Sequence, residues 1–277
     1  MRVTVLGSKG MAGHIVSAYL EQQGHAVHRV DRNQLDIENF NEVKSFFNVL
    51  ETDFVVNCIG LLVKDCADRP DRAAWINSWF PHYIEQQLNN GFARLIHLST
   101  DCVFNGARGD YVETDMHTEM NTYGRSKSLG EVNNSKDITF RMSIIGPELK
   151  NGTGLLHWAT NNPSNELPGW TNAWWNGITT LELARCINLY INKPAISGIY
   201  HLVNNDRINK YELLCKINQV YNLGKKIVPV TGPKNINKVL IDSRKEFEFN
   251  IQSYDDQLQQ LRSFDPLSHV VPTTASS

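Results

Sequence analysis

Cysteine is scarce in this sequence and is not arranged for a metal centre or a disulfide framework. The 277 residues include five cysteines, an odd number, and no two of them form a C-x-x-C pair. The nine histidines include no H-E-x-x-H spacing. This usage is typical of reduced thiols in a cytoplasmic protein, and it predicts no metal site.

Long apolar runs and an excess of one charge are also missing. No stretch of about 18 apolar residues occurs, which is the length that a membrane-spanning helix requires. The first strand pattern begins at residue 3, with no apolar signal segment before it. Lysine and arginine total 27 against 29 aspartates and glutamates, a net charge of -2. We therefore expect no membrane partner and no nucleic-acid partner.

What the sequence does contain is a regular alternation of strand and helix patterns. Strand patterns cover residues 3–6, 26–30, 54–58, 94–98 and 138–143, and helical patterns cover residues 11–23, 43–50, 73–88 and 123–132. This alternation predicts an α/β fold with a doubly wound parallel sheet, the Rossmann arrangement, covered by helices on both faces.

The alternation breaks at residue 147. From there to residue 176 the sequence is rich in loops and tryptophan, after which a helical pattern and a strand pattern resume the sheet. We therefore expect a Rossmann domain formed by residues 1–146 and 177–203. A smaller, discontinuous C-terminal domain would be formed by residues 147–176 and 204–277.

A glycine-rich loop connects the first strand to the first helix. Gly7 permits a tight turn, Gly10 lets the backbone approach a pyrophosphate, and Gly13 lets the helix pack closely on the strand. The N-terminus of that helix would stabilise the anion. Since strand, loop and helix occur in the required order, we predict a dinucleotide site rather than a turn without a ligand, with Lys9 and Met11 beside the cofactor.

Residues after the second strand bear on which dinucleotide binds. Asp31 would hold the ribose hydroxyls of NADH, whereas Arg32 and Lys9 would pair with the 2′-phosphate of NADPH. These signals conflict, and we expect NADPH with NADH tolerated. Asp36 and Ile37 either flank the adenine or begin the next helix.

Further strand ends complete the expected cofactor site. Cys58, Ile59 and Gly60 follow the third strand, where a glycine leaves room for the central sugars of the cofactor. Ser99 follows the fourth strand and is expected at the same ligand. Arg141 ends the next strand near the cleft that faces the small domain, where it either faces a pyrophosphate or forms a structural ion pair. Because ligands of open parallel sheets bind at the carboxyl ends of the strands, these residues should meet at one edge.

Thr100, Tyr123 and Lys127 bring proton-transfer chemistry to that edge. Thr100 follows the fourth strand, and Tyr123 and Lys127, four residues apart, share one face of a helix. The ammonium and an oxidised nicotinamide would lower the pKa of the phenol from about 10. In ketone reduction Tyr123 would be the general acid, Thr100 would hydrogen-bond the carbonyl oxygen and Lys127 would also hold the nicotinamide ribose. Although most Y-x-x-x-K pairs are ordinary helix faces, this combination predicts an NAD(P)H-dependent oxidoreductase.

Three motifs resemble those of the extended short-chain dehydrogenase/reductases, and most of all the dTDP-4-dehydrorhamnose reductases. They are the glycine loop, Ser-Thr-Asp-Cys-Val-Phe-Asn-Gly at residues 99–106, and Asn-Thr-Tyr-Gly-Arg-Ser-Lys-x-x-Gly-Glu at residues 121–131. The resemblance covers residues 1–203 well and the rest loosely. It implies that Thr100, Tyr123 and Lys127 form a catalytic triad, that Asn77 is a structural or cofactor-side residue, and that the small domain binds substrate.

The reaction that this resemblance implies is reduction of the 4-keto group of a nucleotide-linked 6-deoxyhexose by NAD(P)H, in deoxysugar and polysaccharide biosynthesis. The residues expected to contact the substrate are Thr100, Cys102, Val103, Phe104, Trp158 and Trp174. Indole faces stack on nucleobases or sugars, although each tryptophan taken alone fits a core position better.

Two departures from the family pattern leave alternatives open. Cys102 stands where the family usually has tyrosine, and the loop at residues 59–67 differs from the usual A-x-T-x-V-D-x-x-E. One alternative is an epimerase or a bifunctional 3-epimerase/4-reductase acting on a UDP-N-acetyl sugar, with Cys102 as an acid/base thiol rather than an inert one. The other is a non-catalytic regulatory subunit of another enzyme. The nucleotide and the sugar stay open, and the superfamily implies a homodimer.

Overall fold

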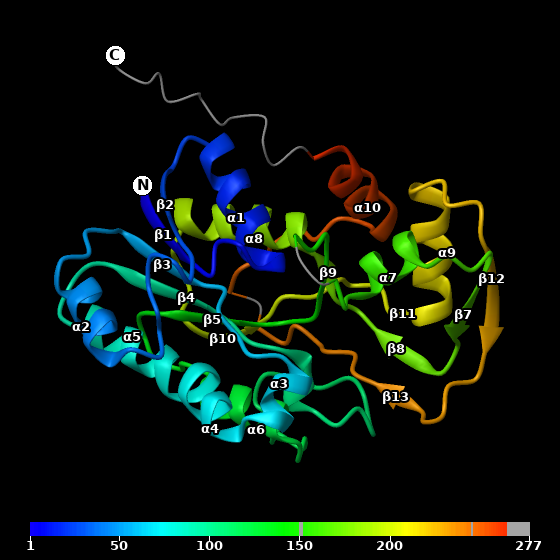
Figure 1. Cartoon of the computed structure of the whole chain (residues 1–277), viewed down its shortest axis with the longest axis horizontal. Coiled ribbons are helices and arrows are strands. Elements are labelled where there is room, and N and C mark those ends of the chain that lie inside the picture. The colour runs from blue at the N-terminus through cyan, green and yellow to red at the C-terminus, as the bar shows by residue number, and fades with distance from the viewer. Residues whose placement is uncertain (150–151, 245, 265–277) are drawn as a thin grey trace.

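The computed structural model describes residues 1–149, 152–244 and 246–264. At its centre is a six-stranded parallel sheet with the order β10-β5-β4-β3-β1-β2 (Figure 1). The strands are β1 (Arg2–Leu6), β2 (Ala26–Val30), β3 (Phe54–Asn57), β4 (Arg94–Leu98), β5 (Ile138–Arg141) and β10 (Gly198–His201). The predicted doubly wound parallel sheet is confirmed.

The winding direction of the sheet reverses between β1 and β3. The chain passes from β1 outward to β2 and returns to β3 on the other side of β1, so that Val5 is paired with Arg29 in β2 and with Val56 in β3. The connections that follow β1 and β3 therefore diverge. In sheets of this kind the crevice at that switch point is where ligands bind.

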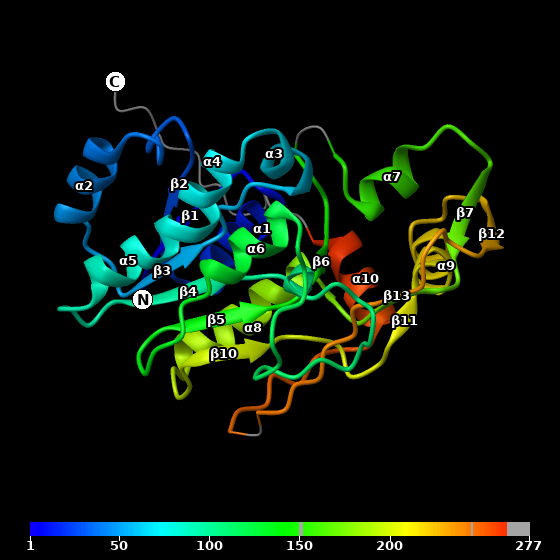
Figure 2. The same ribbon diagram turned by 90° about the horizontal axis from the view of Figure 1, so that it is seen from below.

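Helices cover both faces of the sheet (Figures 1 and 2). On one face α1 (Met11–Gln22) packs against α8 (Thr180–Asn192), and on the other lie α2 (Phe40–Asn48), α5 (Phe80–Leu88) and α6 (Thr122–Leu129). Alternate strand residues point to opposite faces, so Val5 and Val56 join one apolar cluster while Leu6 and Val55 join the other.

The helical pattern at residues 73–88 is interrupted in the structure. α4 (Pro70–Ala73), a π-helical segment η1 (Ala74–Trp79) and α5 follow one another without a break, and a short helix α3 (Val63–Asp68) occupies the loop after β3. The π-helical segment carries Asn77, whose side chain is fully buried. Such segments are frequent near functional sites.

A smaller lobe lies beside the sheet (Figure 1). It contains α7 (Leu155–Asn161), β7 (Glu166–Trp170), β8 (Ala173–Trp175), β11 (Ile208–Asn209), α9 (Lys210–Val220), β12 (Lys226–Val230) and β13 (Ile236–Asn237). β12 pairs with β7, and β8 lies between β11 and β13. Two distant stretches of chain therefore build this lobe together, while β6 (Ile144–Ile145) and β9 (Ile178–Thr179) pair where the chain enters and leaves it.

The chain after β13 does not stay in the small lobe. Arg244 donates to the carbonyl oxygens of Ser197 and Ile199, at 2.7 and 3.2 Å, beside the edge strand β10. Phe249 packs on Phe140 of β5, and α10 (Tyr254–Ser263) then contacts both α8 and α9. The segment expected to form one part of the second domain is thus shared between the two lobes, and its residues 265–277 lie outside the described residues.

Most of the longer helices begin with a polar cap, but α1 does not. Side chains accept backbone N–H groups at the starts of α2, α6, α8, α9 and α10, namely those of Asn39, Asn121, Thr179, Asn209 and Ser253. α1 begins after Gly10, which has no side chain to offer. Its first N–H groups therefore remain available as donors to an anion.

Two kinds of feature are absent from the described ranges. No helix there has the length and apolarity needed to cross a membrane. No three histidine, cysteine, aspartate or glutamate side chains of the same ranges gather as ligands for a metal ion.

Candidate active site

The glycine loop turns sharply at the end of β1. Gly7 has a φ angle of +76°, a conformation that side chains disfavour. A Cβ atom on Gly13 would lie 2.2 Å from the carbonyl oxygen of Gly7, and one on Gly7 would lie 3.0 Å from Ile59. Glycine at these positions therefore lets α1, β1 and the end of β3 approach one another closely.

A cleft of about 370 Å³ opens between this loop and the ends of β2 and β3. Nine of the residues expected at the cofactor line it together: Gly7, Lys9, Gly10, Asp31, Arg32, Ile37, Cys58, Ile59 and Gly60. Apolar side chains that the sequence analysis did not single out complete the wall, those of Val30, Leu35, Leu61 and Ile76.

Six other residues expected at the cofactor do not line this cleft; two of them, Tyr123 and Lys127, belong to the group described below. Gly13 packs beneath Gly7, and the sulfur of Met11 lies toward Gly154 of the small lobe. The carboxylate of Asp36 accepts the N–H of Glu38 at 3.0 Å, in the turn before α2. The hydroxyl of Ser99 donates to Glu131 at 2.6 Å.

Lys9 and Asp31 form an ion pair across the cleft. The other oxygen of Asp31 accepts the backbone N–H of Asn33 at 2.7 Å. The hydrogen bond from Lys9, followed by that from Asn33, holds the pKa of the Asp31 carboxyl below its usual value. The acidic residue is therefore charged but already neutralised by the loop lysine.

The three residues expected to be catalytic meet where β4 ends. Thr100 begins a 3₁₀ turn, η2 (Asp101–Val103), and its hydroxyl accepts the N–H of Cys102 at 3.1 Å. The Nζ atom of Lys127, on α6, donates to the carbonyl oxygen of Leu98 at 2.7 Å. Lys127 acts electrostatically on Cys58, which lines the cleft, and the phenol of Tyr123 is close enough to Thr100 for the two to hydrogen-bond.

Burial dominates the ionisation of this group. It raises the pKa of Tyr123, with the charges of Cys102 and Asp101 adding to the rise and the hydrogen bond with Thr100 opposing it. The direction is opposite to the lowering that the sequence analysis predicts from the lysine and an oxidised nicotinamide. Burial also lowers the pKa of Lys127 to about 8, against the opposing effect of Glu131.

Two glycines, Gly124 within α6 and Gly130 just after its end, set the position of this helix. A Cβ atom on Gly124 would lie 2.5 Å from the carbonyl oxygen of Cys102, and one on Gly130 would lie 1.8 Å from that of Asn77. The Asn77 amide accepts from the N–H of Leu61 at 2.8 Å and donates to Ser126 at 3.1 Å. Asn77 therefore joins α6 to the loop after β3, which is a structural role.

Arg141 takes part in a buried ion pair instead of facing the cleft. Its guanidinium donates to both carboxylate oxygens of Glu131, at 2.8 and 2.6 Å, and also bonds the rings of His117 and His201. Burial opposes ionisation of Glu131, but Arg141, His117 and Ser99 together hold its pKa well below the usual value. Of the two roles considered for Arg141, the structural ion pair is therefore the one observed.

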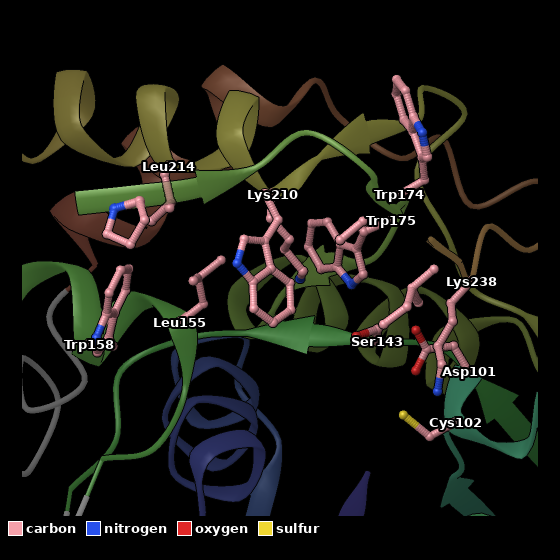
Figure 3. A pocket seen from close by; sticks show the side chains of 14 residues that line it. Asp101, Cys102, Ser143, Leu155, Trp158, Trp174, Trp175, Lys210, Leu214 and Lys238 are labelled. Atoms are coloured by element: carbon pink, nitrogen blue, oxygen red, sulfur yellow. The ribbon is translucent and has the colours of Figure 1, made fainter. Parts of the chain in front are cut away.

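A second pocket, of about 520 Å³, lies between the end of β4 and the small lobe. Four tryptophans line it: Trp158, Trp170, Trp174 and Trp175. Asp101, Cys102 and Lys238 gather at one end, Trp158 and Leu214 lie at the other, and Lys210 and Trp175 lie between them (Figure 3). Of the four indoles Trp175 is a core residue, stacked on Tyr254 at 5.8 Å between ring centroids.

Three neighbouring residues expected at the substrate behave differently. Cys102 lines the pocket, and burial raises the pKa of its thiol to about 11. The side chains of Val103 and Phe104 are instead buried in a separate apolar cluster, where Phe104 stacks on Tyr111 at 4.2 Å. This differs from the expected substrate contacts, because both side chains pack with Tyr111, Val203 and Leu240 instead of facing the pocket.

Comparison with known proteins identifies the family to which this fold and these motifs belong. The model of the family described as "RmlD substrate binding domain" matches residues 1–239. The chain belongs to this family.

The individual relatives share only part of the sequence of this chain. The dTDP-4-dehydrorhamnose reductase of Mycolicibacterium smegmatis is 34% identical over 133 residues, 47% of this chain and 40% of that protein, so the chain matches less than half of that reductase. Methionine adenosyltransferase 2 subunit beta of Pongo abelii is 26% identical over 80% of this chain and 72% of its own length. A solved dTDP-4-dehydrorhamnose reductase from Bacillus anthracis, in complex with NADP, shares the fold with a TM-score of 0.82 at 22% identity, over 95% of this chain and 98% of that one.

In this RmlD-family chain, three charged residues of the second pocket were missed by the sequence analysis. Asp101 belongs to the motif around Thr100, so its position beside the hydroxyl was a usable signal. Lys210 and Lys238 lie more than a hundred residues further along the chain, in no recognisable motif. Only the folding of the small lobe brings them to Asp101.

Proposed function

We propose that this protein uses NADPH to reduce the 4-keto group of a nucleotide-linked 6-deoxyhexose. The observation that supports the proposal is that the group of Thr100, Tyr123 and Lys127 adjoins both cavities. Lys127 acts on Cys58, which lines the glycine-loop cleft, and Thr100 and Tyr123 lie beside Cys102, which lines the tryptophan-lined pocket. Membership of the RmlD family and the relatives named as dTDP-4-dehydrorhamnose reductases agree with it.

The residues of the first cleft fit a dinucleotide. Its glycines leave no Cβ atoms in the way of a pyrophosphate, and the uncapped start of α1 offers N–H donors to it. Lys9 and Arg32 would hold the 2′-phosphate, and Lys9 already neutralises Asp31, the carboxylate among the lining residues of the cleft that would repel it. The NADP bound to the Bacillus anthracis reductase supports the same choice of cofactor.

The chain's own residues would handle the proton. NADPH, when bound, would supply a hydride to the carbonyl carbon. Tyr123 would give its O–H proton to the carbonyl oxygen, so that the ketone would become an alcohol. Because burial raises the pKa of Tyr123, the phenol keeps this proton at neutral pH until the oxygen accepts it. The Thr100 hydroxyl, which now donates to Asp101 at 3.2 Å, would turn to hydrogen-bond the same oxygen.

The decisive assay follows NADPH absorbance while the protein is offered dTDP- and UDP-linked 4-keto-6-deoxyhexoses, with and without an N-acetyl group. We expect oxidation of NADPH with one nucleotide series. Tight NADPH binding without oxidation in any series would refute the proposed reductase activity.

Replacement of the proposed acid gives a sharper test. In Tyr123→Phe we expect turnover to fall by about a hundredfold or more, because the proton donor is lost, while the Kd for NADPH stays unchanged. Tyr221→Phe, which removes a hydroxyl from the partly buried Tyr221 outside both sites, should retain full turnover. Unchanged turnover in Tyr123→Phe would remove Tyr123 from the mechanism.

A regulatory role is the second candidate, because the match to methionine adenosyltransferase 2 subunit beta covers 80% of this chain. Binding of NADPH without turnover would favour the regulatory role. The epimerase alternative has less support, since the Cys102 thiol, with its pKa raised to about 11, stays protonated and is a poor base at neutral pH.

A further inference from the structure

The tryptophan-lined pocket carries an excess of positive charge. Among the side chains that line it, the charged ones are Lys210, Lys238 and Asp101, two ammonium groups against one carboxylate. The rest of the wall is mainly indole and aliphatic carbon. A net positive charge is costly in such surroundings unless an anion accompanies it.

Lys238 has partners within this group. Its ammonium hydrogen-bonds the thiol of Cys102 and is attracted by Asp101, and these interactions raise its pKa against the opposing effect of burial. Asp101 and Lys238 lie together at one end of the pocket (Figure 3). The carboxylate of Asp101 is therefore mainly matched by Lys238.

Lys210 is the second cation of the pocket, and among the described residues it has no carboxylate partner of its own. Its Nζ atom lies over the ring of Trp175, 4.7 Å from the centroid. Within the part of the chain that the structure describes, this ammonium has no hydrogen-bond acceptor and no carboxylate within 4.0 Å. Burial lowers its pKa, with Asp101 and Cys102 opposing the shift from a distance.

The position of Lys210 in its helix adds to this cost. It is the first residue of α9, where the helix dipole disfavours a cation. In the described ranges, this partly buried ammonium has no counter-charge beside it, lies at the unfavourable end of a helix and is held only by its contact with the Trp175 ring. Its placement in the wall of a large pocket is explained if a ligand brings the missing negative charge.

We infer that Lys210 binds the diphosphate of the nucleotide-linked sugar; this rests on the proposed function. The order of groups along the pocket agrees with such a ligand. The reacting sugar would lie at the Asp101 and Cys102 end, next to Thr100, and the base would lie at the far end against Trp158. The diphosphate, between sugar and base, then falls beside Lys210. Lys210 thereby makes the pocket selective for a nucleoside diphosphate over a nucleoside.

Binding of UDP, UMP and uridine, and of dTDP, dTMP and thymidine, tests this inference without turnover. Quenching of tryptophan fluorescence reports the Kd, because four indoles line the pocket. In wild-type protein we expect the diphosphate of one series to bind more tightly than its nucleoside. Lys210→Met should weaken binding of that diphosphate by about 10- to 100-fold and leave binding of the nucleoside unchanged. Lys210→Arg should keep most of the affinity for the diphosphate.

Lys216→Met is the matched control, since Lys216 is on the same helix but is paired with Asp255 at 2.6 Å. A diphosphate affinity that falls no further in Lys210→Met than in this control would overturn the inference, and so would a wild-type protein that prefers neither diphosphate over its nucleoside. The unfolding temperature of Lys210→Met should equal or exceed that of wild type, which excludes misfolding. Diphosphate binding that depends on Lys210 without reduction of any 4-keto sugar would leave the inference standing and refute the proposed function instead.

Discussion

Lys127 shows how one buried residue sets the working pH of the site. Its ammonium is satisfied by the carbonyl oxygen of Leu98, and burial lowers its pKa to about 8. The charged form therefore predominates below that pH and is lost above it. We predict that kcat/KM for NADPH, which reports the free enzyme, falls as the pH rises through about 8. A profile that stays flat to about pH 10, where an ordinary lysine titrates, would contradict this account.

Lys9 acts at the same scale on the choice of cofactor. Removal of its charge should leave Asp31 unpaired and take a cation from the 2′-phosphate. We predict that Lys9→Gln weakens NADPH binding by about tenfold or more and leaves NADH binding unchanged or tighter. Titration of the protein with each cofactor would measure the two Kd values. Lys64→Gln, at an exposed ion pair with Asp68, should change neither Kd. Equal losses for both cofactors in Lys9→Gln would mean that the residue does not discriminate.

At the scale of elements, α6 is held by contacts at both ends. Gly124 lets its start approach Cys102, and the Glu131–Arg141 pair fixes the residues just beyond its end to β5. Glu131 also accepts the hydroxyl of Ser99, next to Thr100. The same ion pair therefore connects the helix that carries Tyr123 and Lys127 with the strand end that carries Thr100.

Loss of the Glu131–Arg141 ion pair should strongly destabilise the fold. Glu131→Gln leaves the buried guanidinium of Arg141 without its counter-charge, and we predict a loss of about 3–5 kcal/mol in the free energy of unfolding, measured in urea. Glu166→Gln makes the same chemical change in an exposed pair with Lys226 and should cost about 1 kcal/mol or less. Similar losses in the two variants would show that Glu131 has no special role.

The elements also show where sequence patterns were informative. All six strands of the large sheet were predictable. Five of them are apolar runs that are largely buried on both faces, and the partly exposed edge strand β2 falls at the spacing that the alternation requires. The strands of the small lobe are only two to five residues long, too short to show a period. α10 did carry a signal, with Ser253 as its cap and Tyr254, Leu258 and Leu261 at helical spacing, but its other residues are strongly polar.

At the scale of the whole molecule, the site is less predictable than the fold. The glycine loop, Thr100 and Tyr123 were found because each belongs to a local motif. Ser99 has the right position in the sequence, yet its hydroxyl turns to Glu131. Lys210 and Lys238 reach the pocket only through the packing of the small lobe, which no local pattern encodes.

That packing joins the two lobes through one apolar core. A single apolar cluster runs from β1 and α8 through Trp175 to Leu213 of α9 and Leu258 of α10. Because α10 contacts both α8 and α9, damage to it should weaken both lobes together. We predict that Leu258→Ala lowers the free energy of unfolding by about 2–5 kcal/mol and shifts one shared transition. Leu129→Ala, at an exposed position of α6, should stay within about 0.5 kcal/mol of wild type. Calorimetry and near-ultraviolet circular dichroism of both variants would check this, and two separated transitions in Leu258→Ala would mean that the lobes unfold independently.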